Sequence, residues 1–90
     1  MKELKVTSQF KKDLKRIQNN PKKLQSLEVV LKYLRNEQPL PPVYKAHMLS
    51  GNFKGCMECH GENDFLLVWI DDTTQTIKLV RLGSHAELFG

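Results

Sequence analysis

A proline-rich segment divides this 90-residue sequence into two parts with different patterns. The run from Gln38 to Pro42 contains three prolines and cannot form a helix, because proline lacks a backbone N–H and restrains the residue before it. Helical spacing of apolar residues precedes the run, and strand-like patterns follow it. Neither part could bury a core alone, so we predict a single domain, residues 1–90, in which this segment is an internal connector.

The first part predicts a short strand and two amphipathic helices. Leu4 and Val6 alternate with polar residues, as in a strand. Ser8 is suited to cap a first helix, in which apolar residues recur at helical spacing between lysines. A second helix is expected from Pro21 to Arg35, because proline fits the first helical turn and leucines line one stripe. Together the two helices form a helical hairpin.

The second part predicts strands separated by short turns. The expected strands are Tyr44–Leu49, Phe53–His60, Phe65–Ile70 and Thr76–Leu82. Phe65–Ile70 is almost wholly apolar, which indicates a central strand buried on both faces. Consecutive strands joined by short loops pair antiparallel. The predicted fold is therefore α+β, in the order β-α-α-β-β-β, with the hairpin packed on one face of a mainly antiparallel sheet of four or five strands. The other face is free to carry a site.

Positive charge is concentrated in the first part of the chain. The formal net charge is +4, but residues 1–36 contain ten Lys and Arg residues and only three acids. A basic half of this kind suits a polyanion such as RNA. The alternative is a lysine-rich helix face that is simply solvated. No apolar run approaches the length of a membrane span and no secretory signal is visible, so we expect a cytoplasmic protein with reduced thiols and no membrane partner.

The segment Cys56–His60 matches the C-x-x-C-H signature of c-type haem attachment, but the strand pattern argues against that use. Alternation places Cys56, Glu58 and His60 on one face and Met57 and Cys59 on the other. Thiols on opposite faces cannot share a metal or form a disulfide. We therefore expect two free thiols, one buried and one semi-exposed, with no haem, metal or other cofactor.

Three histidines lie in the strand-rich part, at positions 47, 60 and 85. Asp64 follows His60 across a short loop, and Arg81 could contact a phosphate bidentately. Two histidines can divide general-base and general-acid roles at neutral pH. RNA supplies its own nucleophile, the 2′-hydroxyl, so its cleavage needs no metal. Taken singly, each histidine is more often a surface or packing residue than a catalytic one.

Three ordered motifs between Leu40 and Gly90 extend this interpretation. They are Tyr-Lys-x-His-x-Leu-x-Gly over residues 44–51, a His followed four residues later by Asp at His60 and Asp64, and Gly-Ser-His-x-x-Leu-Phe over residues 83–89. Together with the helical hairpin, this set resembles the YafQ branch of the RelE/ParE toxin superfamily. The resemblance covers nearly the whole chain.

The resemblance implies a ribosome-dependent mRNA endoribonuclease, the toxin of a type II toxin–antitoxin pair. Its partners would be mRNA on the ribosome, ribosomal RNA and a cognate antitoxin. His47 would be the general base and His85 the general acid. His60 and Asp64 would hold the phosphate and neighbouring side chains, and Phe89 would stack on the substrate or anchor the C-terminus.

Further residues are expected to bind RNA. Those expected to contact the substrate are Phe65, Arg81, Lys45 and Lys54. Those expected to contact ribosomal RNA are Lys11, Lys12, Lys15, Arg16, Lys22 and Lys23. Phe65 departs from the family pattern, in which Trp follows the aspartate. Phenylalanine keeps a stacking face but loses the indole N–H donor.

Two alternatives remain open from the sequence. A toxin of the same fold that acts on DNA gyrase would need no acid–base cluster, and the histidines with Asp64 argue against it. A non-catalytic RNA- or protein-binding module would not depend on His85.

Overall fold

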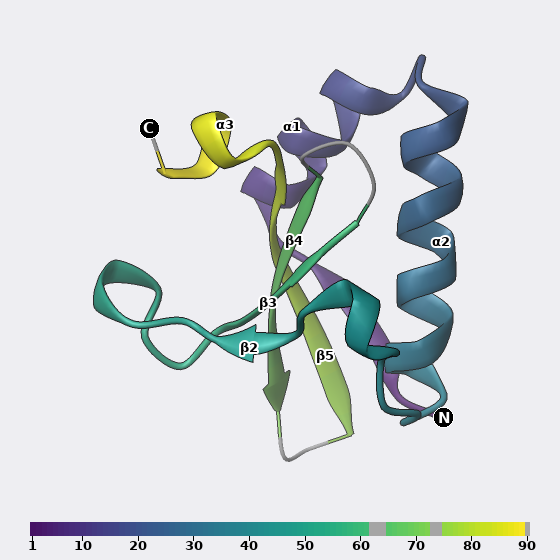
Figure 1. Cartoon of the computed structure of the whole chain (residues 1–90), viewed down its shortest axis with the longest axis vertical. Helices are drawn as coiled ribbons and strands as arrows, with labels where there is room; N and C mark the ends of the chain where they lie inside the picture. The colour runs from purple at the N-terminus through teal and green to yellow at the C-terminus, as the bar shows by residue number, and fades with distance from the viewer. Residues whose placement is uncertain (62–64, 73–74, 90) are drawn as a thin grey trace.

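Five strands form a single mixed sheet in the computed structural model, which describes residues 1–61, 65–72 and 75–89 (Figure 1). The strands are β1 (Glu3–Val6), β2 (His47–Met48), β3 (Met57–His60), β4 (Leu66–Asp72) and β5 (Thr76–Gly83). Their order is β1-β5-β4-β3-β2. β1 is parallel to β5, and the other neighbours are antiparallel. The predicted α+β fold with a mainly antiparallel sheet is confirmed.

The two N-terminal helices begin at side-chain caps. α1 (Ser8–Ile17) is capped by Thr7, whose Oγ1 accepts the backbone N–H of Phe10 at 3.0 Å. The predicted cap at Ser8 is therefore one residue too late. α2 (Pro21–Arg35) has the predicted bounds, with proline in its first turn and Asn20 as its cap. These caps satisfy N–H groups that have no partner inside a helix.

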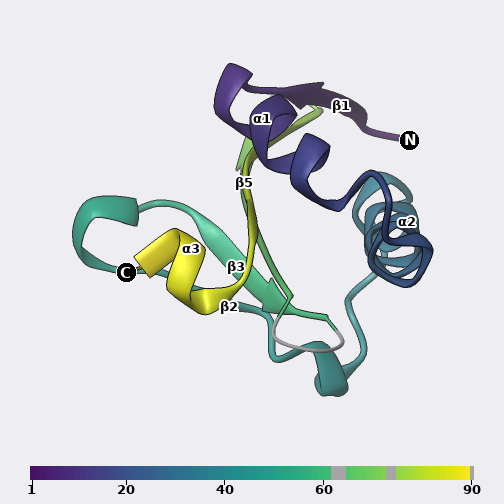
Figure 2. The same ribbon diagram turned by 90° about the horizontal axis from the view of Figure 1, so that it is seen from above.

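Both helices lie on one face of the sheet, and Figure 2 shows the C-terminal helix α3 (His85–Phe89) on the other. The main core fills the space under α1 and α2. It is formed by Phe10, Ile17, Leu27, Val30, Cys59, Phe65, Leu67, Trp69, Ile77, Leu79 and Leu82. No helix among the described residues is both long enough and apolar enough to cross a membrane.

A second, smaller core lies on the opposite face of the sheet. Cys56, Leu66, Val68 and Leu88 are buried there, and Leu88 comes from α3. β4 therefore contributes alternate side chains to two cores. This confirms the prediction of a central strand buried on both faces, and it leaves only part of the second face open for a site.

The segment before β3 is less regular than predicted. Tyr44–Leu49 is not a continuous strand: a 3₁₀ turn covers Pro42–Tyr44, Lys45 is left-handed with φ 49°, and β2 has only two residues. Phe53–His60 is likewise divided between a 3₁₀ turn, Gly51–Phe53, and β3. Two strands of the prediction are thus present in shortened form, because the left-handed residue and the turns interrupt the extended backbone.

A buried carboxylate joins α1 to β5. Asp13, which is 1% exposed, accepts hydrogen bonds from Arg81 Nε at 2.8 Å, the backbone N–H of Leu82 at 3.0 Å and Gln9 Nε2 at 3.2 Å. Burial raises the pKa of Asp13, but the hydrogen bonds from Arg81, Leu82 and Gln9 outweigh it and hold the pKa below its ordinary value. The carboxylate is therefore charged in the folded protein at neutral pH.

We predict that Asp13→Asn lowers the free energy of unfolding at neutral pH by about 3 kcal/mol, because it leaves Arg81 without its charged partner. Asp71→Asn is the matched control, since Asp71 is half exposed in its ion pair with Lys2 and should change stability by less than about 1 kcal/mol. Chemical denaturation measures both values.

The pH dependence provides the second readout of this prediction. A carboxylate with a lowered folded-state pKa stabilises the fold fully above the ordinary pKa of 3.8, and this contribution is lost as pH falls through the folded-state value. The difference between wild type and Asp13→Asn should therefore shrink in strong acid. Equal effects of the two substitutions at neutral pH would contradict the role given to Asp13.

Candidate acid and base site

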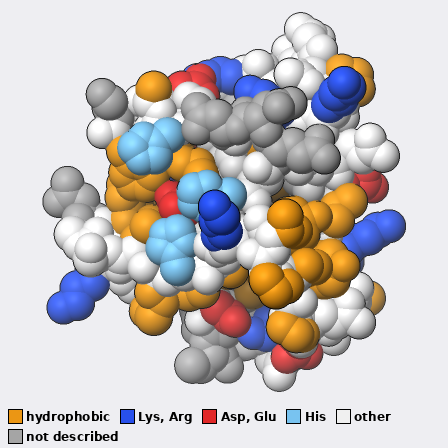
Figure 3. Space-filling view, viewed as in Figure 1, with side chains coloured by type: hydrophobic (Ala, Val, Ile, Leu, Met, Phe, Trp, Pro, Cys, Tyr) orange, Lys and Arg blue, Asp and Glu red, His pale blue; other side chains and the backbone are white. Residues whose placement is uncertain are grey.

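The three histidines gather on one face of the molecule (Figure 3). His47 lies on β2, His60 ends β3 and His85 begins α3. The rings of His47 and His60 have centroids 5.9 Å apart. All three side chains are at least partly exposed, so a ligand can approach them. The chain thus brings its imidazoles together from three separate elements.

Glu58 connects two of these histidines. The β2–β3 register places it directly opposite His47, and strand alternation puts it on the same face as His60. Its Oε1 lies 3.2 Å from Nε2 of His47 and 3.6 Å from Nε2 of His60. The carboxylate is 5% exposed, whereas both imidazoles reach solvent. The buried carboxylate of Glu58 therefore lies beneath two imidazoles that are open to solvent.

The second ring nitrogen of His47 fixes its tautomer. Nδ1 lies 2.7 Å from the backbone carbonyl oxygen of Lys45, which can only accept a hydrogen bond. Nδ1 therefore carries the hydrogen, and in the neutral ring the lone pair is on Nε2, facing Glu58. Lys45, whose carbonyl oxygen makes this contact, has a left-handed backbone conformation. A proton placed between Nε2 and Oε1 would be hydrogen bonded to both atoms.

The other carboxylate oxygen of Glu58 is buried without a partner. Oε2 makes no hydrogen bond with any residue that the structure describes. An unsatisfied buried acceptor typically costs about 1–3 kcal/mol. Such a cost at a surface cluster is typical of a functional site rather than of a packing arrangement.

The same cluster has the donor types of a transition-metal site. One ligand atom from each of His47, Glu58 and His60 lies within 4.8 Å of the others. Two imidazoles and a carboxylate suit first-row divalent cations, and the exposed side leaves room for water or a substrate. No metal was expected from the sequence, because the cysteines do not converge and RNA cleavage does not require one. This set of ligands was not predicted.

A network of polar contacts fixes the position of α3. Ser84 and Glu87 form reciprocal hydrogen bonds, with Ser84 N donating to Oε1 at 2.7 Å and Glu87 N donating to Ser84 Oγ at 3.2 Å. Oε2 of Glu87 lies 3.4 Å from Nη1 of Arg16 on α1. The hydrogen bond from the Ser84 N–H lowers the pKa of Glu87. A Cβ at Gly83 would lie only 2.9 Å from Oε1, so glycine keeps this cap intact.

Phe89 is held between two aromatic rings. Its ring centroid is 5.2 Å from that of His85 and 5.5 Å from that of Phe53, which meets it edge to face. Phe89 is nevertheless 40% exposed. The ring therefore supports His85 and still offers a surface to a ligand.

The structure contradicts one expected substrate contact and restricts another. Phe65 is 1% exposed and packs in the main core with Leu67 and Trp69, so its ring has no face open for stacking. Asp13 occupies the edge of the Arg81 guanidinium formed by Nε and Nη2, so this edge is not open to a phosphate, and a contact through the other edge stays a prediction. Phe65 is buried because it alternates with Leu67 and Trp69 on the core face. Arg81 is engaged because the carboxylate of Asp13 is buried beside it on α1.

The remaining predicted residues have different outcomes. Lys45 and Lys54 are exposed, and the backbone of Lys45 orients His47. Asp64 lies outside the described residues. The expected RNA-binding residues of α1 and α2 are exposed, except that Lys23 is partly buried and Arg16 pairs with Glu87.

Glu58 was not among the site residues predicted from the sequence. Its position two residues before His60 placed it on the same face of the predicted strand, and this alternation could have indicated that it belongs to the site.

The two cysteines lie in different cores. Cys56 packs with Leu66, Val68 and Leu88, and Cys59 packs in the main core, so their predicted placement on opposite faces is confirmed. The expectation that one thiol is semi-exposed is wrong, because α3 covers the face on which Cys56 lies. Burial raises the pKa of Cys56. Burial and the charge of Glu58 raise the pKa of Cys59 to about 12.

We predict that neither thiol of the folded protein reacts rapidly with a disulfide reagent such as dithionitrobenzoate at mildly alkaline pH, because both are shielded and protonated. Both should react in denaturing guanidinium chloride. Absorbance of the released thiolate measures the reaction. Fast, stoichiometric modification of one thiol in the native protein would contradict the burial of both.

Comparison with known proteins agrees with this fold. Residues 2–90 match the family described as the bacterial toxin of type II toxin–antitoxin system, YafQ. The mRNA interferase toxin YafQ of Escherichia coli K12 is 36% identical over 90 residues, which covers 99% of this chain and 97% of that protein. The chain therefore belongs to the YafQ family of toxins of type II toxin–antitoxin systems.

Solved structures extend the comparison. A metal-bound toxin from Helicobacter pylori is 44% identical, with a TM-score of 0.87 over 99% of this chain and 100% of that chain. The toxin of the E. coli DinJ–YafQ complex is 35% identical, with a TM-score of 0.84 over the full length of both chains. In those proteins the same fold is seen with a metal and with a second protein, respectively.

Proposed function

We propose that this toxin is an mRNA endoribonuclease that acts on the ribosome and uses histidines as acid and base. The observation that carries the proposal is the cluster of His47, Glu58 and His60 on the face that also holds His85 and Phe89. The E. coli relative, called an mRNA interferase, supports the same class of reaction.

The proposed reaction breaks one P–O bond and forms another. The 2′-oxygen of the message attacks the neighbouring phosphorus while the bond from phosphorus to the 5′-oxygen breaks. A base takes the proton of the 2′-hydroxyl, and an acid gives a proton to the departing 5′-oxygen. The products are a 2′,3′-cyclic phosphate and a 5′-hydroxyl. Each such participant typically contributes about 10²–10⁴ in rate.

His47 is the proposed base. Its contact with the Lys45 carbonyl directs a lone pair to Nε2, where Oε1 of Glu58 lies 3.2 Å away. A proton arriving from the 2′-hydroxyl is then held between the imidazole and the carboxylate in a charge-assisted hydrogen bond. His60, on the other side of Glu58, is suited to contact the phosphate. Asp64 stays a predicted participant.

His85 is the proposed acid. It begins α3, whose first turn is fixed by the Ser84–Glu87 cap and linked to α1 by the ion pair between Glu87 and Arg16. Phe89 packs against the imidazole and offers its exposed edge to a base or sugar. The proposed acid and base thus stand on different elements, so a scissile phosphate can lie between them.

The partners follow from charge and from the relatives. Four exposed lysines of α1 and α2 are suited to bind ribosomal RNA: Lys11, Lys12, Lys15 and Lys22. YafQ of E. coli is crystallised with DinJ, and we propose a cognate antitoxin that covers the histidine face of this toxin. A transition-metal ion held by His47, Glu58 and His60 would occupy the lone pairs that the reaction needs. We therefore assign no catalytic step to a metal.

We predict that His47→Ala and His85→Ala each slow cleavage of ribosome-bound mRNA by about 100-fold or more, without a change in melting temperature. A message with sulfur in place of the scissile 5′-oxygen separates their roles, because a thiolate leaves without a proton. This substrate should restore cleavage by His85→Ala and should not restore cleavage by His47→Ala. Primer extension under single-turnover conditions measures the rates.

Two results would count against the proposal. Wild-type rates in both variants would show that the histidines do not catalyse the cleavage. If the sulfur-substituted message restored cleavage by His47→Ala and not by His85→Ala, the assigned roles of acid and base would be reversed. Melting curves of the variants control for loss of the fold.

A further inference from the structure

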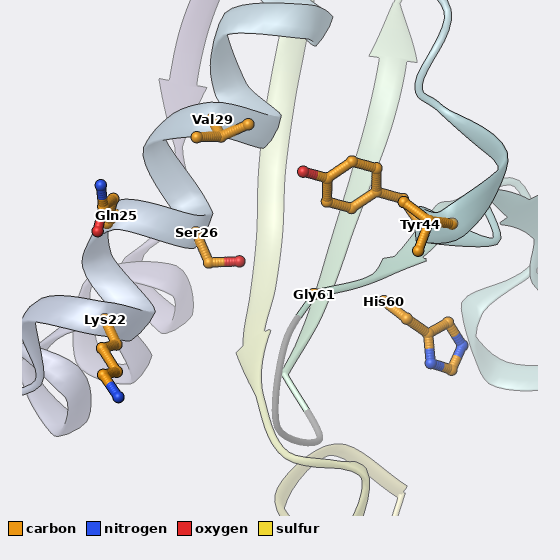
Figure 4. A pocket seen from close by; sticks show the side chains of 8 residues that line it. Lys22, Gln25, Ser26, Val29, Tyr44, His60 and Gly61 are labelled. Atoms are coloured by element: carbon orange, nitrogen blue, oxygen red, sulfur yellow. The ribbon is translucent and has the colours of Figure 1, made fainter.

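A cavity of about 530 Å³ lies between α2 and the turn before β2. Its lining from the helix consists of Lys22, Gln25, Ser26 and Val29. Val43, Tyr44, His60 and Gly61 form the opposite side (Figure 4). Its size falls within the range of sites that bind small molecules. The cavity is separate from the cluster around Glu58 but shares His60 with it.

We propose that this cavity, here called the α2 pocket, binds the nucleobase of a message nucleotide next to the scissile phosphate. The inference rests on the proposed ribonuclease function and adds to it a subsite for substrate recognition. The α2 pocket combines apolar walls, polar groups and a nearby cation, which correspond to the faces and edges of a base and to its phosphate.

The walls of the α2 pocket suit the flat faces of a base. Val43 is 76% exposed and Val29 is 38% exposed, although both are apolar. The ring of Tyr44 also lines the pocket and contacts the ring of Tyr33, with centroids 6.4 Å apart. Figure 3 shows apolar side chains exposed on the same face as the histidines. Stacking on an aromatic ring is a common way to hold an unpaired base.

The polar groups of the α2 pocket suit the edge of a base. Figure 4 shows the hydroxyls of Ser26 and Tyr44 directed into the space from opposite sides. Neither hydroxyl takes part in a hydrogen bond within the described part of the chain. A hydroxyl can donate or accept, so the pair can meet either kind of group on a base. Lys22 at the rim adds a charge for a phosphate.

The α2 pocket adjoins the acid–base cluster at the end of β3. His60 and Gly61 are consecutive residues, and in Figure 4 the imidazole points away from the helix while Gly61 lies towards it. A Cβ at Gly61 would lie 2.9 Å from Ser26 Oγ, which shows how closely the strand end approaches α2. A phosphate beside His60 would therefore place an adjoining base at the opening of the pocket.

Ribosome-bound mRNA tests the proposal. Single-turnover cleavage over a range of toxin concentrations gives a maximal rate and a half-saturating concentration. Tyr44→Ala should raise the half-saturating concentration about five- to tenfold, because a stacking surface is lost, and leave the maximal rate within about twofold. Lys22→Ala should raise it about two- to threefold and reduce its dependence on salt.

Tyr44→Phe and Lys32→Ala complete the set of variants. Tyr44→Phe keeps the ring, so it should keep the affinity but relax the nucleotide preference at one position beside the cut. Lys32→Ala removes an exposed lysine of the same helix outside the α2 pocket and should leave both parameters unchanged. Melting temperatures control for the loss of the contact between Tyr44 and Tyr33.

The outcomes separate this inference from the proposed function. If Tyr44→Ala and Lys22→Ala match Lys32→Ala in half-saturation and cleavage sites, the α2 pocket does not bind the message. The same result with weaker antitoxin binding would assign the pocket to a protein partner and also overturn the inference. If His85→Ala cuts at the wild-type rate, the proposed ribonuclease function fails whatever the pocket variants show.

Discussion

The carboxylate of Asp13 is the interaction on which the arrangement of the two halves depends. It is buried between α1 and β5 and accepts hydrogen bonds from a side chain and a backbone N–H that are 68 and 69 residues away in sequence. The end of β5 is thereby fixed to α1, and Gly83 and Ser84 continue from it into α3. Arg16, on the same helix, adds the ion pair to Glu87. His85 therefore has its position because the N-terminal helix holds the C-terminal strand.

The opposite face of the sheet combines stability with chemistry. Its small core under α3 buries Cys56, Leu66 and Val68. At the neighbouring edge, the carboxylate of Glu58 lies below two imidazoles, and one of its oxygens has no hydrogen-bond partner among the residues that the structure describes. A sheet optimised for stability alone would place an apolar or neutral side chain there. The proposed function accounts for the energetic cost of burying Glu58, because its carboxylate has to receive or hold a proton during the reaction. The α2 pocket would then add recognition of the substrate beside that site.

Much of this architecture was predictable because it depends on local periodicity. The bounds of α2 follow from Pro21 and its leucine stripe, and the burial of β4 follows from its apolar run. Alternation also separated Cys56 from Cys59. The contacts of Arg81 were not predictable, because Asp13 is distant in sequence, and the bulge between β4 and β5 disturbs the alternation there. Phe65 was misassigned because the family position was given more weight than its alternation with Leu67 and Trp69.

The proposed reaction requires that the buried carboxylate beneath the two histidines takes part in catalysis, and the Glu58→Gln variant tests this role. Glutamine keeps the shape but cannot share a proton with His47 in the same way. Single-turnover cleavage of ribosome-bound mRNA should fall about 100-fold in this variant, while the melting temperature stays the same or rises, because a buried charge is removed. Cleavage at the wild-type rate by a folded Glu58→Gln protein would show that the Glu58 carboxylate takes no part in the reaction.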